Sequence, residues 1–182
     1  MQTLNAQKTR FSGKTLAVTA MFAALVTVTT AFIKIPAPLG YAHAGDSMVY
    51  LAACALPAPF NFIAAGLGGA LADLLSGYAV WSLPTAIIKS LNVLPFFLAR
   101  IILSKKNKDD KILRIPILAA TVLTAGITIG GYFIANWIIY DINAAIAEIP
   151  FNIMQSIVGT ALFVALGIAL DAIQFKQKLF PQ

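Results

Sequence analysis

Long apolar segments separated by short polar connections are the feature that most constrains how this chain can fold. Of its 182 residues, 59% are hydrophobic and only 11% are charged, and the mean hydropathy is +0.84. A surface that faces water needs a larger charged fraction. Because a helix needs about 20 apolar residues to cross the hydrocarbon core of a bilayer, the chain has room for roughly six spans. We therefore expect an integral membrane protein with a single domain, residues 1–182.

Prolines and polar residues divide the apolar sequence into six predicted helices, with approximate bounds Lys14 to Ile33, Asp46 to Leu56, Phe60 to Ser76, Pro84 to Leu103, Ile115 to Tyr140 and Pro150 to Phe175. Pro84 and Pro150 suit the first turn of a helix, and Ile35-Pro36 predicts an extended loop after the first helix. The second helix is too short to cross alone, so we expect it to be tilted or shielded by its neighbours. The predicted fold class is an all-α bundle of six transmembrane helices.

The distribution of positive charge predicts the direction of this bundle. Six spans place both termini and two connections on one side, and all basic residues except Lys34 and Lys89 fall there: Lys8, Arg10, Lys14, Arg100, Lys105, Lys106, Lys108, Lys111, Arg114, Lys176 and Lys178. Basic connections stay in the cytoplasm. We therefore expect cytoplasmic termini in a bacterial-type cell membrane. Because these charges lie between spans and form no continuous stripe, we expect no nucleic-acid partner.

Polar side chains within the spans are the best indication of a functional site, because each one is costly in a bilayer unless it has a partner, a cavity or a ligand. They gather near the outer ends of the predicted helices and in the outer loops. We expect them to line one outward-facing pocket for a small ligand: Lys89, Asn92, Tyr41, His43, Asp46, Asp73, Tyr78, Trp81, Asn136, Tyr140, Asn152 and Gln155.

Several of these residues also allow a purely structural interpretation. Lys89 could touch a ligand, or it could form an internal ion pair with Asp73 or Asp46 that holds helices together. Asp46 follows Gly45 directly before the second helix, so its simplest role is to cap that helix. His43 could be an ordinary surface residue of a loop. The aromatic residues could belong to the interfacial belt of the membrane: Tyr78, Trp81 and Tyr140.

Catalysis finds little support in this sequence. With one histidine and one cysteine, Cys54, the chain groups no nucleophile with a base, no set of metal ligands and no disulfide. It also lacks the GxxxxGK[ST] motif that cradles nucleotide phosphates. We therefore expect neither an enzyme nor a metal or cofactor site, and energy for any transport must come from another protein.

A stripe of small residues lies along one face of the first predicted helix. Ala17, Ala20 and Ala24 recur at helical spacing, and small residues let helix backbones approach closely. The stripe could pack within the bundle, or it could present a flat surface to another membrane protein. The third helix also carries small residues, for which packing inside the bundle is expected.

The order of these features resembles the substrate-binding S component of energy-coupling factor (ECF) vitamin transporters. The resemblance covers essentially the whole chain, from a basic N-terminus to the sixth predicted helix. The segments that carry it are Ala20-Met21-Phe22-Ala23-Ala24, Ile35-Pro36, His43-Ala44-Gly45-Asp46, the run from Gly68 to Tyr78, and Ile87-Ile88-Lys89.

This resemblance implies a function and a set of partners. An S component captures a small vitamin or vitamin precursor on the outer face and delivers it through a transmembrane coupling protein and two ABC ATPases. In this family the pattern at Ala20 and Ala24 packs on the coupling protein, and substrate is held by the first and third loops and by helices four to six. The closest likeness is to members for hydroxymethylpyrimidine or pyridoxine-like compounds, with riboflavin, thiamine, folate and pantothenate left open.

The alternative is a self-sufficient secondary transporter of a small metabolite. Such proteins usually contain internal repeats and polar residues near the middle of the bilayer. We find no clear repeat in this sequence, and its polar residues lie toward one end of the predicted helices.

Overall fold

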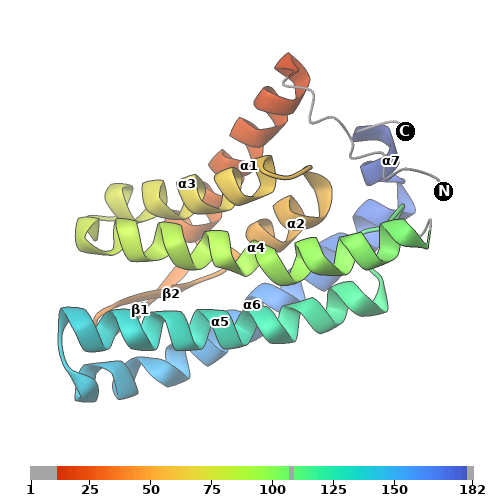
Figure 1. The fold of residues 1–182 in the computed structure, drawn as a ribbon. Coiled ribbons are helices and arrows are strands. Elements are labelled where there is room, and N and C mark those ends of the chain that lie inside the picture. Colours follow the sequence, from red (N-terminus) through yellow and green to blue (C-terminus); the bar gives the residue numbers. More distant parts are fainter. Residues whose placement is uncertain (1–11, 107–108, 180–182) are drawn as a thin grey trace.

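A computed structural model describes residues 12–106 and 109–179 of the chain (Figure 1). Its elements are helices α1 (Gly13–Phe32), α2 (Asp46–Ala55), α3 (Phe60–Leu75), α4 (Ser82–Lys105), α5 (Ile115–Ile139), α6 (Ile142–Ala172) and α7 (Phe175–Leu179), strands β1 (Lys34–Ala37) and β2 (Gly40–His43), and a 3-10 turn, η1 (Ala79–Trp81). Three of the basic residues used to predict the topology, Lys8, Arg10 and Lys108, lie outside the described residues.

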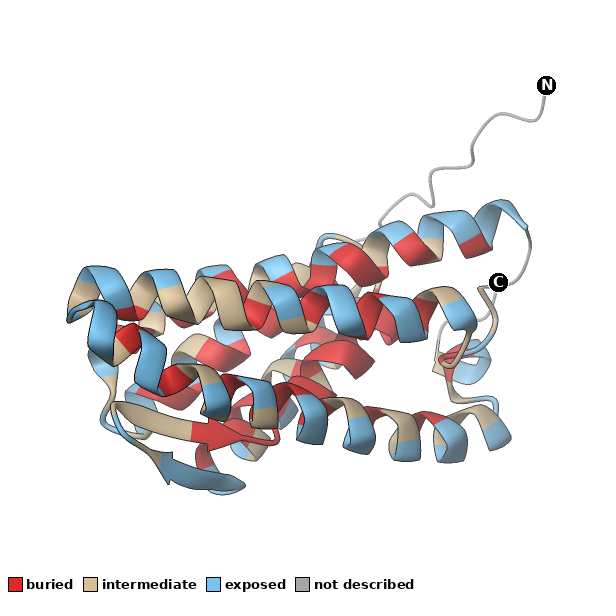
Figure 2. Cartoon of the chain, turned by 90° about the horizontal axis from the view of Figure 1, so that it is seen from below, coloured by how far each residue is buried: buried red, intermediate tan, exposed pale blue. Residues whose placement is uncertain are grey.

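Four segments are long and apolar enough to cross a membrane: α1, η1 with α4, α5, and α6. Large apolar side chains such as Val122, Leu123 and Ile138 on α5 are more than half exposed. Figure 2 shows that exposed positions recur along the outer faces of the helices. A helix that is apolar on its outer face as well as its inner face is typical of a membrane span. Helices α2 and α3 are shorter apolar helices. The count of six spans and the direction of the termini stay predictions.

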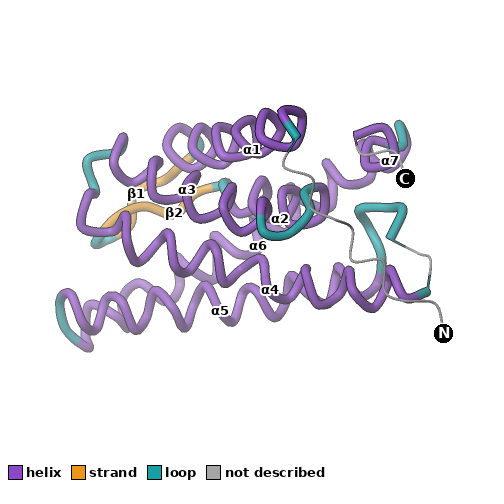
Figure 3. Tube along the Cα trace, turned by 45° about the horizontal axis from the view of Figure 1, so that its top comes forward, coloured by secondary structure: helices purple, strands orange, loops and turns teal. Residues whose placement is uncertain are grey.

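The helices pack in chain order around a central short helix. Helix α1 packs on α3, α3 on α4, α4 on α5, and α5 on α6, while α2 contacts α1, α3, α4 and α6 (Figure 3). Every residue of α2 except Met48 is buried. The expectation that this short helix is shielded by its neighbours is therefore confirmed. The β1–β2 hairpin lies at one end of the bundle and α7 at the other.

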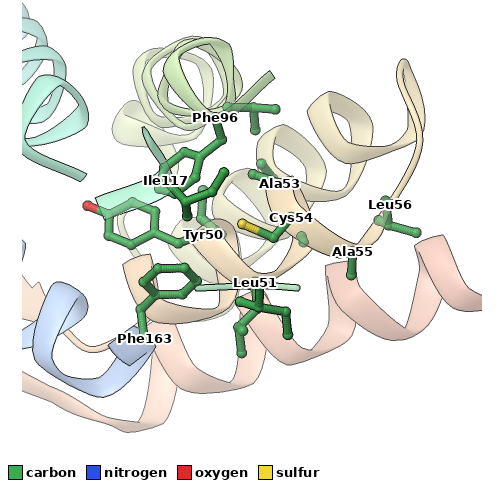
Figure 4. Close-up of a cluster of buried hydrophobic side chains, with 14 of the residues drawn as sticks. Tyr50, Leu51, Ala53, Cys54, Ala55, Leu56, Phe96, Ile117 and Phe163 are labelled. Atoms are coloured by element: carbon green, nitrogen blue, oxygen red, sulfur yellow. The ribbon is translucent and has the colours of Figure 1, made fainter. Parts of the chain in front are cut away.

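The core of the bundle is an aromatic cluster around α2 (Figure 4). The Tyr50 ring stacks on Phe96 of α4 with centroids 5.0 Å apart and meets Phe163 of α6 edge-on at 5.7 Å. Cys54 lies buried one turn further along α2 as a free thiol. Between helices in a bilayer, such contacts stabilise mainly through close packing, because lipid tails are as apolar as the side chains.

The C-terminal end of α2 is tied to α4 by an arginine. The Arg100 guanidinium donates through Nη1 to the Ala53 carbonyl at 2.9 Å and to the Leu56 carbonyl at 2.5 Å. Carbonyls in the last turn of a helix have no partner within the helix, and a cation there also interacts favourably with the helix dipole. Asp109 holds Arg100 through Nε at 3.3 Å and Lys176 of α7 at 2.5 Å.

The segment after α1 differs from the prediction of an all-α protein. It forms an antiparallel hairpin in which Lys34 pairs with His43 and Ala37 with Gly40. The prolines at positions 36 and 38 exclude a helix there, which the sequence indicated. The pairing of the two strands depends on their register and on the helices beneath them, so the hairpin itself was missed.

The start of the sixth helix was also predicted wrongly. Helix α6 begins at Ile142, and Pro150 lies inside it. The cause is a cap at Asp141, whose side chain accepts a hydrogen bond from the Ala144 N–H at 2.9 Å. Pro84 does lie in the first turn of its helix, as expected, because α4 begins at Ser82. Helix α6 ends at Ala172, and Gln174, with φ of 54°, separates it from α7.

Candidate functional site

A cavity of about 50 Å³ lies beneath the hairpin and is the candidate site. Its walls come from the hairpin, the end of α3, η1, the start of α4, the second half of α5 and the first half of α6. The lining residues are Leu39, Gly40, Tyr41, His43, Asp73, Tyr78, Trp81, Thr85, Tyr132, Asn136, Glu148, Asn152 and Gln155. Eight of these belong to the set that the sequence predicted.

Tyr41 joins the hairpin to the end of α3. Its hydroxyl donates to Asp73 Oδ1 at 2.7 Å, and its ring packs against Tyr78 with centroids 5.2 Å apart. Burial and the neighbouring Asp73 carboxylate raise the pKa of Tyr41, so the hydroxyl keeps its proton and remains a donor. The Lys34 ammonium lies 4.3 Å from the centre of the same ring and donates to Ser76 Oγ at 2.8 Å.

Three buried polar atoms of cavity-lining residues have no hydrogen-bond partner among the described residues. They are Asp73 Oδ2, Trp81 Nε1 and Asn136 Oδ1, and their side chains are 5%, 7% and 2% exposed. The amide nitrogen of Asn136 already donates to the Tyr132 carbonyl at 2.9 Å, which leaves its oxygen as the open acceptor. Buried polar groups in native proteins are normally paired. Among the cavity-lining residues, two acceptors and one donor are therefore available for further hydrogen bonds.

His43 is buried in the wall of the cavity rather than exposed in a loop. Its Nδ1 accepts the Gly45 N–H at 3.1 Å, so the neutral ring carries its proton on Nε2. Burial, reinforced by the positive charge of Lys89, lowers the pKa of His43 to about 3. The imidazole is therefore neutral and offers one N–H donor. The interpretation of His43 as an ordinary surface residue is wrong, since only 7% of it is exposed.

The first half of α6 supplies the opposite wall. Glu148 Oε1 accepts the Leu39 N–H at 2.7 Å, which ties the tip of the hairpin to α6. Asn152 Nδ2 donates to the Glu148 carbonyl at 3.1 Å. Gln155 Nε2 donates to Asp46 Oδ2 at 3.1 Å, so its position depends on α2.

Lys89 and Asp46 form an ion pair within the bundle and do not line the cavity. Their side chains are 1% and 0% exposed. Of the two carboxylates considered as partners for Lys89, the structure selects the one on α2. Asp46 does not cap α2, whose N-cap residue is Gly45. Its carboxylate is instead shared between Lys89 and Gln155, because a buried charge requires a counter-charge and hydrogen bonds more than a helix end requires a cap.

A close approach of α6 to α2 makes this arrangement possible. A Cβ placed on Gly159 would lie 2.7 Å from the Cβ of Asp46, which is closer than real Cβ contacts allow. The glycine therefore lets the start of α2 lie directly against α6, within reach of Gln155 one turn earlier.

Two other predicted site residues lie outside the cavity lining. Asn92 is buried between α4 and α5, where its Nδ2 donates to Thr128 Oγ1 at 2.9 Å. Tyr140 is 45% exposed, with its ring centre 6.2 Å from that of Trp81. Tyr140 fits the interfacial belt better than the pocket.

The sequence reasoning missed five lining residues: Leu39, Gly40, Thr85, Tyr132 and Glu148. Helical spacing could have found three of them. Tyr132 lies four residues before Asn136, Glu148 lies four residues before Asn152, and Thr85 lies four residues before Lys89. Each therefore shares a helix face with a residue that was predicted. The two hairpin residues carry no comparable signal.

The alanine stripe of α1 faces outward. Ala17, Ala20 and Ala24 are exposed in the structure, whereas the α1 residues Thr27 and Val26 face α3, with the Thr27 hydroxyl donating to the Gly68 carbonyl at 3.0 Å. Of the two interpretations that the sequence left open, packing of the stripe within this bundle is therefore not found. Among the described residues, no three His, Cys, Asp or Glu side chains come together as metal ligands.

Taken together, the fold and the site define a helical membrane protein with a cavity, lined by polar and aromatic residues, under a hairpin at one end. The family model described as "ECF-type riboflavin transporter, S component" matches residues 10–172. The chain belongs to this family. S components are substrate-binding membrane subunits of transporters and are not enzymes.

Two further proteins are similar to this chain. A Pyrococcus woesei protein described as "Uncharacterized protein in gap 3'region" is 33% identical over 149 residues, covering 80% of this chain and 93% of that protein. A solved structure described as "Structure and mechanism of the S component of a bacterial ECF transporter" has the same fold, with a TM-score of 0.68 at 24% identity, covering 88% of this chain and 96% of the other.

These comparisons confirm the predicted resemblance to ECF S components. They do not support the hydroxymethylpyrimidine or pyridoxine-type subgroup, because the matching family model is that of the riboflavin transporters.

Proposed function

We propose that this chain is the substrate-binding subunit of an ECF-type importer and that it captures a flat, hydrogen-bonding vitamin, riboflavin first among the candidates. The observation that carries the proposal is the cavity under the hairpin, around which two acceptors and one donor are buried without partners among the described residues. The family supplies the class of ligand.

The aromatic rings around the cavity support a flat ligand. Tyr41, Tyr78, Trp81 and Tyr132 all contribute to its lining. Aromatic side chains can stack on a heterocycle, while the open polar atoms beside them can bond to its edge. Within this proposal, the binding residues are those predicted residues that line the cavity: Tyr41, His43, Asp73, Tyr78, Trp81, Asn136, Asn152 and Gln155.

The hairpin must move for such a ligand to enter. The cavity of about 50 Å³ is far smaller than the roughly 300 Å³ or more of typical small-molecule sites. Three contacts of the hairpin would have to yield: Tyr41 with Asp73, the Leu39 N–H with Glu148, and Lys34 with Ser76. None of the three involves α2, so lifting the hairpin breaks no contact of the aromatic core around that helix.

We further propose that α2 and α3 complete a six-span topology with cytoplasmic termini in the cell membrane, the hairpin lying on the outer face. A transmembrane coupling protein would then dock on the exposed stripe of Ala17, Ala20 and Ala24, and two ABC ATPases would supply the energy. The outward orientation of this stripe supports such a contact, because small side chains let two helices approach closely.

Binding is tested by titrating the purified protein with riboflavin and following tryptophan fluorescence. The chain contains two tryptophans. Trp81 lines the cavity, whereas Trp137 lies on α5 and is 56% exposed. We expect riboflavin to quench the wild-type protein and the Trp137→Phe variant, and the quenching to be largely lost in Trp81→Phe. Absence of any riboflavin binding by the wild-type protein, by fluorescence and by mass spectrometry of retained small molecules, would refute the proposed ligand.

Transport is tested in proteoliposomes. We expect riboflavin uptake only when the coupling protein and the two ATPases are reconstituted together with this chain. Uptake by the chain alone, driven by an ion gradient, would instead establish the self-sufficient secondary transporter.

A further inference from the structure

A second hollow, of about 330 Å³, lies between the end of α1, the base of the hairpin and α6. We call it the α1–α6 groove. It shares His43 and Gln155 with the candidate cavity and has otherwise different walls, so it is a separate site. Its lining is mostly apolar and includes Phe32, Ile33, Ile35, Met154 and Val158.

The two long helices beside this groove do not close it. Among the described residues, α1 packs on α2 and α3, and α6 packs on α2 and α5, but α1 and α6 are not packed on each other. Phe32, Ile33 and Val158 of the lining are therefore 77%, 57% and 41% exposed. Because α1 and α6 are both long and apolar enough to cross a membrane, the opening between them faces lipid. A lipid acyl chain matches such a lining and can fill it, whereas water finds few polar partners there.

One lysine lies in the wall of the groove. Lys34 is the only lysine or arginine in its described lining. Helix α1 has 20 residues, about the number that crosses the hydrocarbon core, so Lys34, two residues after its end, lies near the level of the lipid headgroups. The Lys34 ammonium contacts the Ser76 hydroxyl and the Tyr41 ring, which are uncharged. It makes no ion pair within the described part of the chain.

An anionic headgroup fits this lysine best. The flexible lysine stem lets the ammonium turn toward a lipid phosphate at the rim of the groove. That phosphate would supply the counter-charge that Lys34 does not have within the described residues. In phosphatidylcholine a choline cation already lies beside the phosphate, whereas phosphatidylglycerol carries no cation. Charge complementarity therefore favours phosphatidylglycerol.

We infer that the α1–α6 groove binds one anionic phospholipid, with an acyl chain along Phe32, Met154 and Val158 and the phosphate at Lys34. The bound lipid completes the packing between α1 and α6 beside the hairpin. This site lies outside the candidate cavity and does not depend on which vitamin that cavity takes, so the inference goes beyond the proposed function.

The test is native mass spectrometry of the full chain, purified in micelles that contain equal amounts of phosphatidylglycerol and phosphatidylcholine. We expect one lipid to be retained per chain, with phosphatidylglycerol in about fivefold excess, as one lysine near an anionic lipid should give. Phosphatidylglycerol with a diazirine at the end of one acyl chain should label α6 near Met154 and Val158 more than the exposed face of α5.

Two pairs of variants test the two ends of the lipid separately. Val158→Trp fills the groove and should abolish retention, while Val122→Trp, at a 72% exposed position of α5 outside the lining, should not. Lys34→Gln should remove the preference for phosphatidylglycerol. Lys111→Gln, which removes an exposed cation from the connection between α4 and α5, should keep it.

Three results would overturn the inference. Equal labelling of α5 and α6, or retention that survives Val158→Trp, would mean that only the general lipid shell surrounds this face. An undiminished preference for phosphatidylglycerol in Lys34→Gln would refute the recognition of the phosphate, and this variant changes only an exposed side chain should Val158→Trp fail to fold. A dimer without retained lipid, broken by Val158→Trp, would make the occupant a second copy of this chain.

Discussion

The ion pair between Lys89 and Asp46 offers the sharpest test of how the bundle is held together. Lys89→Met keeps most of the apolar stem, which packs against α3 near Gly69, and removes only the ammonium group. The Asp46 carboxylate, 0% exposed, would then keep Gln155 as its remaining side-chain partner. Removing one member of a buried pair typically costs about 3–5 kcal/mol, because the other charge stays buried without compensation. We expect Lys89→Met to lower the free energy of unfolding by this amount.

A second substitution tests whether the unpaired buried charge of Asp46 causes the loss of stability in Lys89→Met. Asp46→Asn combined with Lys89→Met removes both charges and keeps an oxygen that can accept from Gln155. If the uncompensated carboxylate is the cause of the loss, the double variant should be more stable than Lys89→Met by about 2 kcal/mol. The exposed Lys105, in the last turn of α4, provides the control: Lys105→Met should change stability by less than about 0.5 kcal/mol.

The measurement is reversible unfolding in mixed detergent micelles, followed by tryptophan fluorescence, with riboflavin affinity measured on the same samples. A double variant no more stable than Lys89→Met would refute the reasoning from charge. A Lys89→Met variant of normal stability whose riboflavin affinity falls more than about tenfold would show that Lys89 contacts the ligand, contrary to its place outside the cavity.

Three further predictions use the same unfolding measurement. Gly159→Ala should lower the free energy of unfolding by about 1–3 kcal/mol, because its new methyl group would overlap α2. Gly126→Ala on α5, which has open space around it, should not lower it. Equal effects of the two substitutions would contradict the close approach of α6 to α2. Arg100→Met should lower the free energy of unfolding by about 1.5–3 kcal/mol through the lost bonds to the carbonyls at the end of α2. Arg114→Met loses a partly exposed ion pair with Asp110 and should lower it by about 0.5 kcal/mol or less. The His43 pKa of about 3 lies below the unfolded value of about 6.5, so between these two values the unfolded state binds one more proton than the folded state. The free energy of unfolding should therefore decrease as the pH is lowered, by about 2–3 kcal/mol from pH 6.5 to 4.5. His43→Gln should show a shallower dependence of stability on pH.

The sequence indicated eight of the residues that line the cavity, because a bilayer makes polar residues conspicuous. Asp73, Asn136 and Gln155 stand in segments that are otherwise apolar, so the cost of burying them was itself the signal. A soluble protein would hide comparable residues among many other polar ones. The same argument predicted the membrane environment itself, which four long apolar helices and the family now support.

The sequence could not show which charged side chains pair with each other inside the bundle. Asp46 and Lys89 lie 43 residues apart, and only the packing of α2 against α4 and α6 decides that they meet. A helix cap is a local interaction, so the sequence suggested one for Asp46, although wrongly. The ion pair is a tertiary interaction, so the sequence could not decide between Asp46 and Asp73 as the partner of Lys89. The hairpin was missed for the same reason, since the pairing of Lys34 with His43 depends on register and not on composition.

The two aspartates near the hairpin show why residue type alone does not separate structure from binding. Both are buried carboxylates, and the sequence left both open as partners for Lys89. In the structure, both oxygens of Asp46 are engaged, one by Lys89 and one by Gln155. Asp73, which lines the cavity, has one oxygen engaged by Tyr41 and one buried without a hydrogen-bond partner among the described residues. A fully satisfied carboxylate stabilises the fold, and a half-satisfied one stores an unmade hydrogen bond that a ligand can complete. Neutralising Asp46 should therefore lower stability more than affinity, and neutralising Asp73 should lower affinity more than stability.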